Sequence, residues 1–311
     1  MSKTRNSIKG QLVAIAIGAV VSTGGAALAD QAGDAARADM QKTIGFIPSF
    51  VKALPENALP GLWEQIKGFE MNPQTALSSK TKELIGLAVA AQMPSRLNIY
   101  AYEKCSRAAG ATQAEVTEAV TISAMARHWS TFFNGAQLDE AKFRAELAKL
   151  KENITKAVAS GAAPPKPLAI TDARSVYADA QQSFGFVPEF IKRFPPEALP
   201  GAWLMFRDVE MNPQTALPGK TKSLISLAVA SQIPCRYCII ADTEFAKLEG
   251  ATDREVTEAV TMAAVARQWI ALIDGLQIDE KSFKRDMDRL NAGAAHAAKG
   301  AKPARMAAKS E

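Results

Sequence analysis

A long internal repeat is the feature that most constrains this chain of 311 residues. The segment QKTIGFIPSFVKALPENALPG begins at Gln41, and QQSFGFVPEFIKRFPPEALPG begins at Gln181. The motif MNPQTAL occurs at Met71 and again at Met211, so the offset is the same, and roughly half of the paired positions are identical. A period of this length indicates a duplicated domain, because the repeats of solenoid proteins are only about 20–50 residues long. The sequence therefore predicts two similar domains.

Apolar residues within each copy recur at spacings of three and four, which indicates amphipathic helices. In KELIGLAVAAQ the predicted buried stripe consists of Leu84, Leu87, Ala88 and Ala91. In AEVTEAVTISAMARHW it consists of Val116, Val120, Ser123 and Ala124. Alternating β-branched runs, which would indicate strands, are scarce. We therefore predict an all-α fold of two tandem domains with five to seven helices each, packed against each other as a pseudo-dimer.

The start of the chain has the pattern of a secretory signal peptide. Three basic residues stand near the start, the apolar run LVAIAIGAVV follows, and Ala27-Leu28-Ala29 matches the small-x-small cleavage pattern. We predict a signal peptide over residues 1–29 and a mature protein that is periplasmic or secreted. No stable membrane anchor is expected after cleavage; an uncleaved anchor is the alternative.

Composition suggests the remaining boundaries. We place the first domain at 30–158, the Pro- and Ala-rich linker ASGAAPPKPLAI at 159–170 and the second domain at 171–290. Residues 291–311 form a low-complexity tail that we expect to be disordered. The net charge of +5 comes from the two ends of the chain, since the body between them is near −1. That balance leaves no basic face for nucleic acid.

The stretch PCRYCIIAD contains two of the three cysteines. Pro234 ends one segment, and the next helix is expected to begin at about Cys235, where the helix dipole favours a thiolate. Arg236 adds a nearby cation. Cys235, Cys238 and Asp242 share one helical face by their spacing. We predict a pair that exchanges between dithiol and disulfide, with Asp242 handling a proton.

A structural disulfide, or two inert buried thiols, is the alternative interpretation of the pair. The first copy has Ser95 and Asn98 at the two cysteine positions. Both cysteines lie on one turn, so one copy cannot easily be half of a redox site. We interpret the first copy as a structural partner, able to line the cleft of the second. The third cysteine, Cys105, is expected to be a free buried thiol outside the pair.

The sequence TKSLISLAVASQIPCRYCIIAD from Thr221 resembles the signature of the carboxymuconolactone decarboxylase-like superfamily, particularly its AhpD-like alkylhydroperoxidase branch. The likeness covers residues 40–150 and 180–290. It implies an all-α fold, a homo-oligomer (here a trimer of two-domain chains) and CxxC-dependent reduction of peroxides. In that branch the second cysteine attacks the peroxide and the first resolves it, which implies these roles for Cys238 and Cys235.

The family pattern also has a glutamate twelve residues before the first cysteine and a histidine four residues after the second. The corresponding residues of the second copy are Ser223 and Asp242, whereas the first copy keeps the glutamate as Glu83. We therefore expect slow peroxide reduction, with disulfide exchange better preserved. No cofactor is expected, and no metal site, because the chain has only two histidines and no acid cluster at ligand spacing.

The sequence thus favours an exported thiol oxidoreductase that acts on a peroxide or a disulfide and is restored by an unidentified thiol reductant. The first alternative is a cofactor-free lactone decarboxylase or hydrolase of the same superfamily, which would not depend on the cysteine pair. The second is a non-catalytic assembly protein, which the incomplete glutamate and histidine pattern favours.

Overall fold

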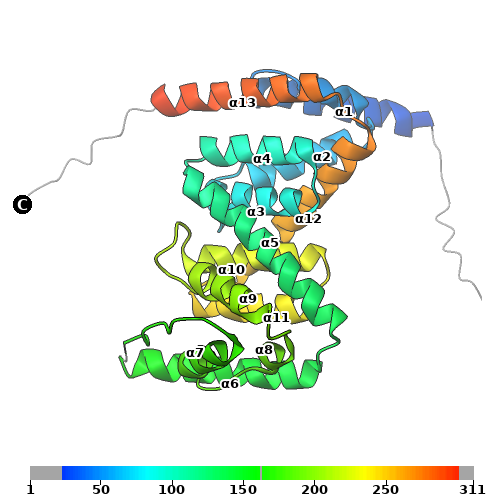
Figure 1. Cartoon of the computed structure of the whole chain (residues 1–311). Helices are drawn as coiled ribbons and strands as arrows, with labels where there is room; N and C mark the ends of the chain where they lie inside the picture. Colours follow the sequence, from blue (N-terminus) through cyan, green and yellow to red (C-terminus); the bar gives the residue numbers. More distant parts are fainter. Residues whose placement is uncertain (1–22, 162, 301–311) are drawn as a thin grey trace, which may run out of the picture.

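The computed structural model describes residues 23–161 and 163–300, and these residues form helices with no strand among them (Figure 1). The prediction of an all-α fold is confirmed. The helices of the first copy are α1 (Thr23–Ile44), η1 (Ser49–Ala53), α2 (Leu59–Gln65), η2 (Ile66–Glu70), α3 (Ser79–Gln92), α4 (Arg96–Ala108), α5 (Gln113–Gly135) and α6 (Glu140–Ala159).

The second copy repeats this order after the connection between the copies. Its helices are α7 (Ala173–Phe184), α8 (Glu189–Arg193), α9 (Leu199–Met205), η3 (Phe206–Glu210), α10 (Gly219–Gln232), α11 (Arg236–Leu248), α12 (Asp253–Gly275) and α13 (Glu280–Gly300). From α2 to α5, each helix has a counterpart that begins and ends at the equivalent positions of the second copy. The start signals repeat as well, because Thr112 and Thr252 each cap a helix through a capping box.

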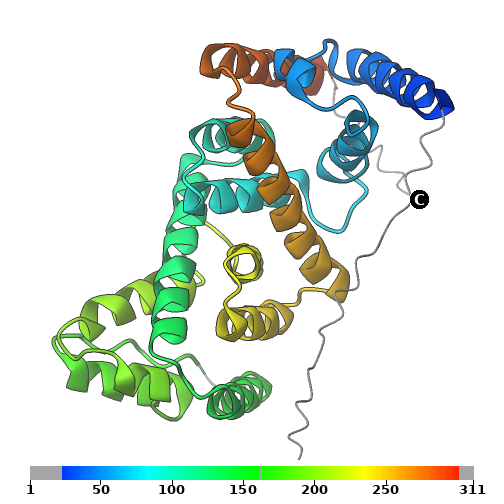
Figure 2. The ribbon, with the colours of Figure 1, turned by 90° about the vertical axis from the view of Figure 1, so that its right-hand side faces the viewer.

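The centre of the molecule is shared between the copies. Residues 82–90 of α3 and 222–230 of α10 are all buried, on every side of both helices. Helix α3 contacts α12, and α10 contacts both α3 and α5; Figure 2 shows α10 between α5 and α12. One core cluster accordingly holds side chains from both copies. Neither copy buries its central helix without the other.

The buried stripe predicted for α3 is confirmed at Leu84, Leu87 and Ala88, although burial extends around the whole helix. The stripe predicted for α5 is wrong in part, because Val120 and Ala124 are exposed. The buried face of α5 includes Val116, Ala119, Ile122, Ser123 and Ala126. The Ser123 hydroxyl donates a hydrogen bond to the backbone oxygen of Ala88 at 2.7 Å, which turns this face toward α3.

Reciprocal hydrogen bonds join the copies. The Glu258 carboxylate on α12 accepts from the backbone N–H of Leu77 at 2.8 Å. Its counterpart Glu118 on α5 accepts from the backbone N–H of Leu217 at 3.1 Å. Each carboxylate satisfies a backbone donor of the loop before the other copy's central helix. Each copy therefore contacts the other through an equivalent carboxylate. The packing of the two copies as a pseudo-dimer stays a prediction.

The last helix of each copy covers the other copy. Helix α6 packs on α11 and α7, whereas α13 packs on α4 and η1. Figure 1 shows α6 with α7 and α8 at one end of the molecule and α13 with α1 at the other. The Glu146 carboxylate on α6 accepts the backbone N–H of Glu189 at 3.0 Å, and Asp286 on α13 accepts that of Ser49 at 2.5 Å. The packing therefore crosses the predicted domain boundaries, which stay a prediction.

The predictions for the two ends have different outcomes. Residues 291–300 continue α13, so the expectation of a disordered tail is wrong for them. The reason is their alanine content, since alanine has the highest helix propensity. Residues 301–311 lie outside the described residues, as do residues 1–22 of the predicted signal peptide. Helix α1 runs across the predicted cleavage point after Ala29.

In the described part of the chain, α12 alone has the length and apolar composition of a membrane span. Its Ala259, Met262 and Ala266 side chains are fully buried in the shared core. The apolar composition of α12 is thus accounted for by its place between the copies.

Candidate functional site

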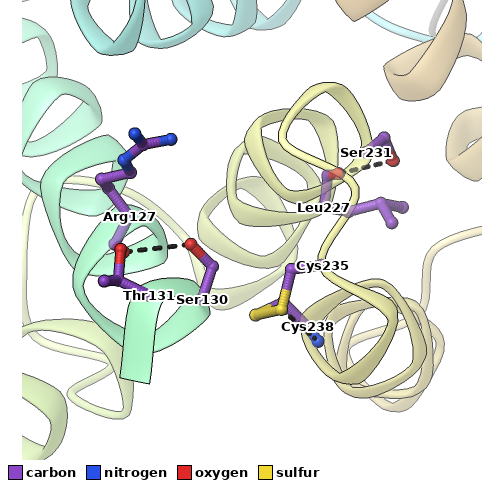
Figure 3. Close-up of a disulfide and its surroundings, with 7 residues drawn as sticks. All are labelled: Arg127, Ser130, Thr131, Leu227, Ser231, Cys235 and Cys238. Atoms are coloured by element: carbon purple, nitrogen blue, oxygen red, sulfur yellow. Dashed lines mark hydrogen bonds between the residues drawn. A yellow bond between two sulfur atoms is a disulfide. The ribbon is translucent and has the colours of Figure 1, made fainter. Parts of the chain in front are cut away.

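The cysteine pair lies where α10 turns into α11. Cys235 is the N-cap of α11, as the sequence predicts, and its Sγ accepts a hydrogen bond from the backbone N–H of Cys238 at 3.3 Å. The two residues form a disulfide with their Cα atoms 5.4 Å apart (Figure 3). The cation expected from Arg236 is directed elsewhere, because its guanidinium pairs with Glu140 of α6 at 3.3 Å.

Only one of the two sulfurs faces a cavity. Cys235 is fully buried and Cys238 is 5% exposed. Cys238 lines a cavity of about 80 Å³ that Cys235 does not reach; we name it the α11 cavity. Cys235 does not follow the helical face because, as the N-cap, it has an extended backbone with φ −90° and ψ 97°. The predicted common face thus holds for Cys238 and Asp242 and not for Cys235.

The walls of the α11 cavity come from both copies. Helices α5 and α6 of the first copy contribute apolar side chains, including Trp129, Phe133 and Phe143. The second copy contributes others, including Phe184, Phe190 and Phe245. Rings from the two copies meet edge to face, with Trp129 and Phe190 centroids 5.5 Å apart. In Figure 3, Ser130 of α5 lies opposite the disulfide. The first copy therefore lines the cleft, as the sequence interpretation expects.

Two carboxyl groups complete the α11 cavity. Asp242 on α11 is 6% exposed, and its Oδ2 has no hydrogen-bond partner among the described residues. Glu210, at the end of η3, lines the same cavity. Burial raises the pKa of Glu210 to about 7. Burial, and then the neighbouring Glu210, raise the pKa of Asp242 well above its usual range, against the effect of Ser226.

These pKa shifts define the charge of the cavity at neutral pH. The raised pKa of Asp242 favours its protonated, uncharged form, which repels a thiolate at Cys238 less than a carboxylate would. Glu210 is near its midpoint and can accept or donate a proton. The cavity therefore combines a sulfur, a neutral carboxylic acid and a carboxyl group poised for proton transfer.

Sequence reasoning missed Glu210 as a site residue. It stands well before Cys238 in the chain, with all of α10 between them, and its approach to α11 depends on the tertiary fold. One signal was available, since both copies have a glutamate directly before MNPQTAL, at Glu70 and Glu210. Ser223, at the family's glutamate position, does not line the α11 cavity. The carboxyl group of Glu210 is thus the one that the structure brings to the sulfur.

Cys105 is free and half-buried, outside the disulfide, as predicted for a thiol outside the pair. Burial raises its pKa well above the usual range, which keeps the thiol protonated. Within the described ranges there is no group of three or more His, Cys, Asp and Glu side chains arranged to hold a metal ion.

Comparison with known proteins connects the second copy to a family. Residues 197–281 match the model of the Carboxymuconolactone decarboxylase family, and this stretch contains Glu210, the cysteine pair and Asp242. "Uncharacterized protein 4 in cox locus" of Paracoccus denitrificans is 42% identical over 52 residues, which are 17% of this chain and 47% of that protein. The chain thus spans about half the length of this relative. No solved structure matches the chain.

Proposed function

We propose that the protein is a thiol-dependent oxidoreductase of the AhpD-like kind, and the match of residues 197–281 to the Carboxymuconolactone decarboxylase family supports this proposal. The observation that carries the proposal is the α11 cavity, where Cys238 of a cysteine pair lies with two carboxyl groups of raised pKa. One carboxyl group can remove the proton of the attacking thiol, and the other can supply a proton to the leaving group.

The first step of the proposed reaction oxidises Cys238 in the reduced protein. The Glu210 carboxylate takes the thiol proton, and the thiolate attacks the terminal oxygen of a hydroperoxide. The O–O bond breaks, Cys238 becomes a sulfenic acid, and the alkoxide leaves with the proton of Asp242. The peroxide gains the two electrons that the sulfur loses.

The second step forms the disulfide. Cys235 attacks the Cys238 sulfur, the S–O bond breaks, and the departing hydroxide takes the Cys235 thiol proton and becomes water. The proton held by Glu210 then passes to the neighbouring Asp242 carboxylate. Both carboxyl groups return to their starting states, and the sum is two thiols and one peroxide converted to a disulfide, an alcohol and water. The backbone N–H of Cys238 and the helix dipole favour the Cys235 thiolate.

The burial of the pair favours a small substrate. With Cys235 fully buried and Cys238 5% exposed, a protein thiol would have to enter through the apolar cavity. A small organic hydroperoxide can enter, so the burial of the pair favours peroxide reduction over exchange with a protein disulfide, which is the reverse of the expectation from the sequence. A small dithiol is the matching class of reductant, because it must reach the same sulfur.

The carboxyl pair also supports a second candidate. Two carboxyl groups of raised pKa beside an apolar cavity suit general acid–base chemistry on a lactone, as in a cofactor-free decarboxylase or hydrolase. That activity would not consume thiols. It would survive the substitution Cys238→Ser, whereas thiol-dependent peroxide reduction would not.

We also propose that the protein is exported to the periplasm and assembles as a trimer of two-domain chains. The basic start, the apolar run and Ala27-Leu28-Ala29 support export. Mass spectrometry of the native protein should find Asp30 as the first residue, and light scattering should give three times the chain mass. A native chain that begins at Met1 would contradict export, and a monomer would contradict the assembly.

The cysteine variants test the thiol mechanism. Cys238→Ser should abolish turnover of a small alkyl hydroperoxide such as ethyl hydroperoxide with dithiothreitol as the reductant, because no thiolate then faces the cavity. Cys235→Ser should consume about one equivalent of peroxide and stop at the sulfenic acid, detected by mass. Cys105→Ser, outside the α11 cavity, should retain most of the activity. Equal losses in Cys238→Ser and Cys105→Ser would show that the assigned thiol roles are wrong.

The variant Glu210→Gln tests the proton acceptor. The pKa of Glu210 is raised to about 7, so the carboxylate fraction and the rate of Cys238 oxidation should rise from pH 5.5 to 7.5. Glu210→Gln should remove this rise and slow oxidation by about a hundredfold, within the range for a general base. Glu64→Gln, whose side chain is 65% exposed, serves as the control. An unchanged pH profile in Glu210→Gln, measured by stopped-flow fluorescence, would exclude Glu210 as the base.

A further inference from the structure

A second cavity, of about 170 Å³, lies beside α4 at the position in the first copy that corresponds to the α11 cavity. We name it the α4 cavity. Its apolar walls again come from both copies and include Met40, Phe50, Trp63, Trp269, Phe283 and Met287. An engineered apolar cavity of about 150 Å³ in another protein holds a benzene molecule. The α4 cavity therefore has room for a single ring with a short substituent.

Polar atoms without a partner line this apolar space. Glu83 is 9% exposed, and its Oε2 and that of Glu70 are buried with no hydrogen-bond partner among the described residues. The Nε1 of Trp269 is also buried with no hydrogen-bond partner among the described residues. A buried polar group left without a partner costs about 1–3 kcal/mol, so a ligand that donates hydrogen bonds to the two carboxyl oxygens would be favoured.

The nearest cation does not satisfy these carboxyl groups. The Lys82 ammonium donates to three other acceptors at 2.6–2.9 Å: the backbone oxygens of Phe69 and Asn72 and the hydroxyl of Thr75. All three ammonium protons are therefore used. Burial raises the pKa of Glu83 well above its usual range and that of Glu70 to about 7. Without a further cation, the pair holds a proton.

The α4 cavity has been reshaped rather than closed in the copy that lacks cysteines. Asn98 stands where the second copy has Cys238, and Tyr102 stands where it has Asp242. The Tyr102 ring lies against Gly86, where a Cβ atom would clash with it. The cavity is nevertheless larger than its counterpart and retains two carboxyl groups, Glu70 and Glu83.

We propose that the α4 cavity binds a small apolar amine, with the ammonium group between Glu83 and Glu70 and the apolar part against Trp63 and Trp269. A buried carboxylate is stabilised by a paired cation that donates hydrogen bonds to it. A neutral alcohol of the same shape supplies no charge, and a carboxylate ligand would be repelled. This binding site is independent of the thiol chemistry proposed for Cys238.

Cys105 provides a reporter inside the α4 cavity. It lines the cavity and is free, whereas Cys235 and Cys238 are joined in the disulfide. A small alkylating reagent such as iodoacetamide should therefore modify Cys105 alone in the oxidised protein, and slowly, because burial favours the protonated thiol. Saturating benzylamine should slow this modification at least about fivefold, by occupying the space beside the thiol. Benzyl alcohol and benzoate at the same concentration should slow it less than about twofold.

The variant Glu83→Gln tests the charge requirement, because it keeps the shape of the side chain and removes its charge. It should raise the benzylamine concentration for half-protection of Cys105 at least about tenfold, each variant being compared with its own ligand-free rate. The matched control is Ser223→Ala, at the corresponding position of the second copy, which should leave that concentration unchanged. If Glu83→Gln does not fold, Glu70→Gln provides the same test.

Three results would each overturn the proposal. The first is that benzylamine does not protect Cys105 from alkylation, and the second is that benzyl alcohol protects it equally well. The third is that a folded Glu83→Gln or Glu70→Gln variant needs the same benzylamine concentration for half-protection. The assay uses oxidised protein, which has no thiol pair with which to reduce peroxide. Its failure would therefore leave the proposed function of the α11 cavity unaffected.

Discussion

The burial of α3 and α10 against each other is the constraint on which the rest of the structure depends. Residues 82–90 and 222–230 are covered on every side, and the covering helices come from both copies. Once the central helices are shared, α5 and α6 extend over the second copy, and α12 and α13 extend over the first. Each cavity is consequently walled by both copies, and the surroundings of Cys238 depend on the first copy.

The two cavities show how one framework accommodates different chemistry. Lys82 and Lys222 donate to the same three types of acceptor in their loops, so this support is the same in both copies. The exchanges of Cys238 for Asn98 and of Asp242 for Tyr102 lie at cavity-lining positions. In the first copy the Tyr102 ring becomes part of the shared core and lies against Gly86 of α3. The first copy therefore keeps the packing without the cysteines.

Some of this structure could be predicted from the sequence, and the limits have physical causes. Helical periodicity indicated the all-α fold, and the Pro-Cys junction indicated the start of α11, because both signals are local. The exchange of α6 and α13 between the copies could not be predicted, since a helix's pattern does not say which copy it covers. The position of Glu210 in the α11 cavity could not be predicted either, because it depends on how η3 lies relative to α11. The exposed Val120 marks another limit, because rotation of α5 depends on tertiary contacts.

The central claim is that the first copy completes the α11 cavity around Cys238. It is tested most directly by the alkylation rate of Cys238 in the reduced protein, resolved from the other thiols by peptide mass spectrometry. Phe143 on α6 lines the α11 cavity, whereas its counterpart Phe283 on α13 lines the α4 cavity. Phe143→Ala should speed alkylation of Cys238 at least about fivefold by opening the cavity. Phe283→Ala, in the same copy as Cys238, should leave the rate unchanged. The opposite pattern, in which Phe283→Ala speeds the alkylation of Cys238 and Phe143→Ala leaves it unchanged, would contradict the account.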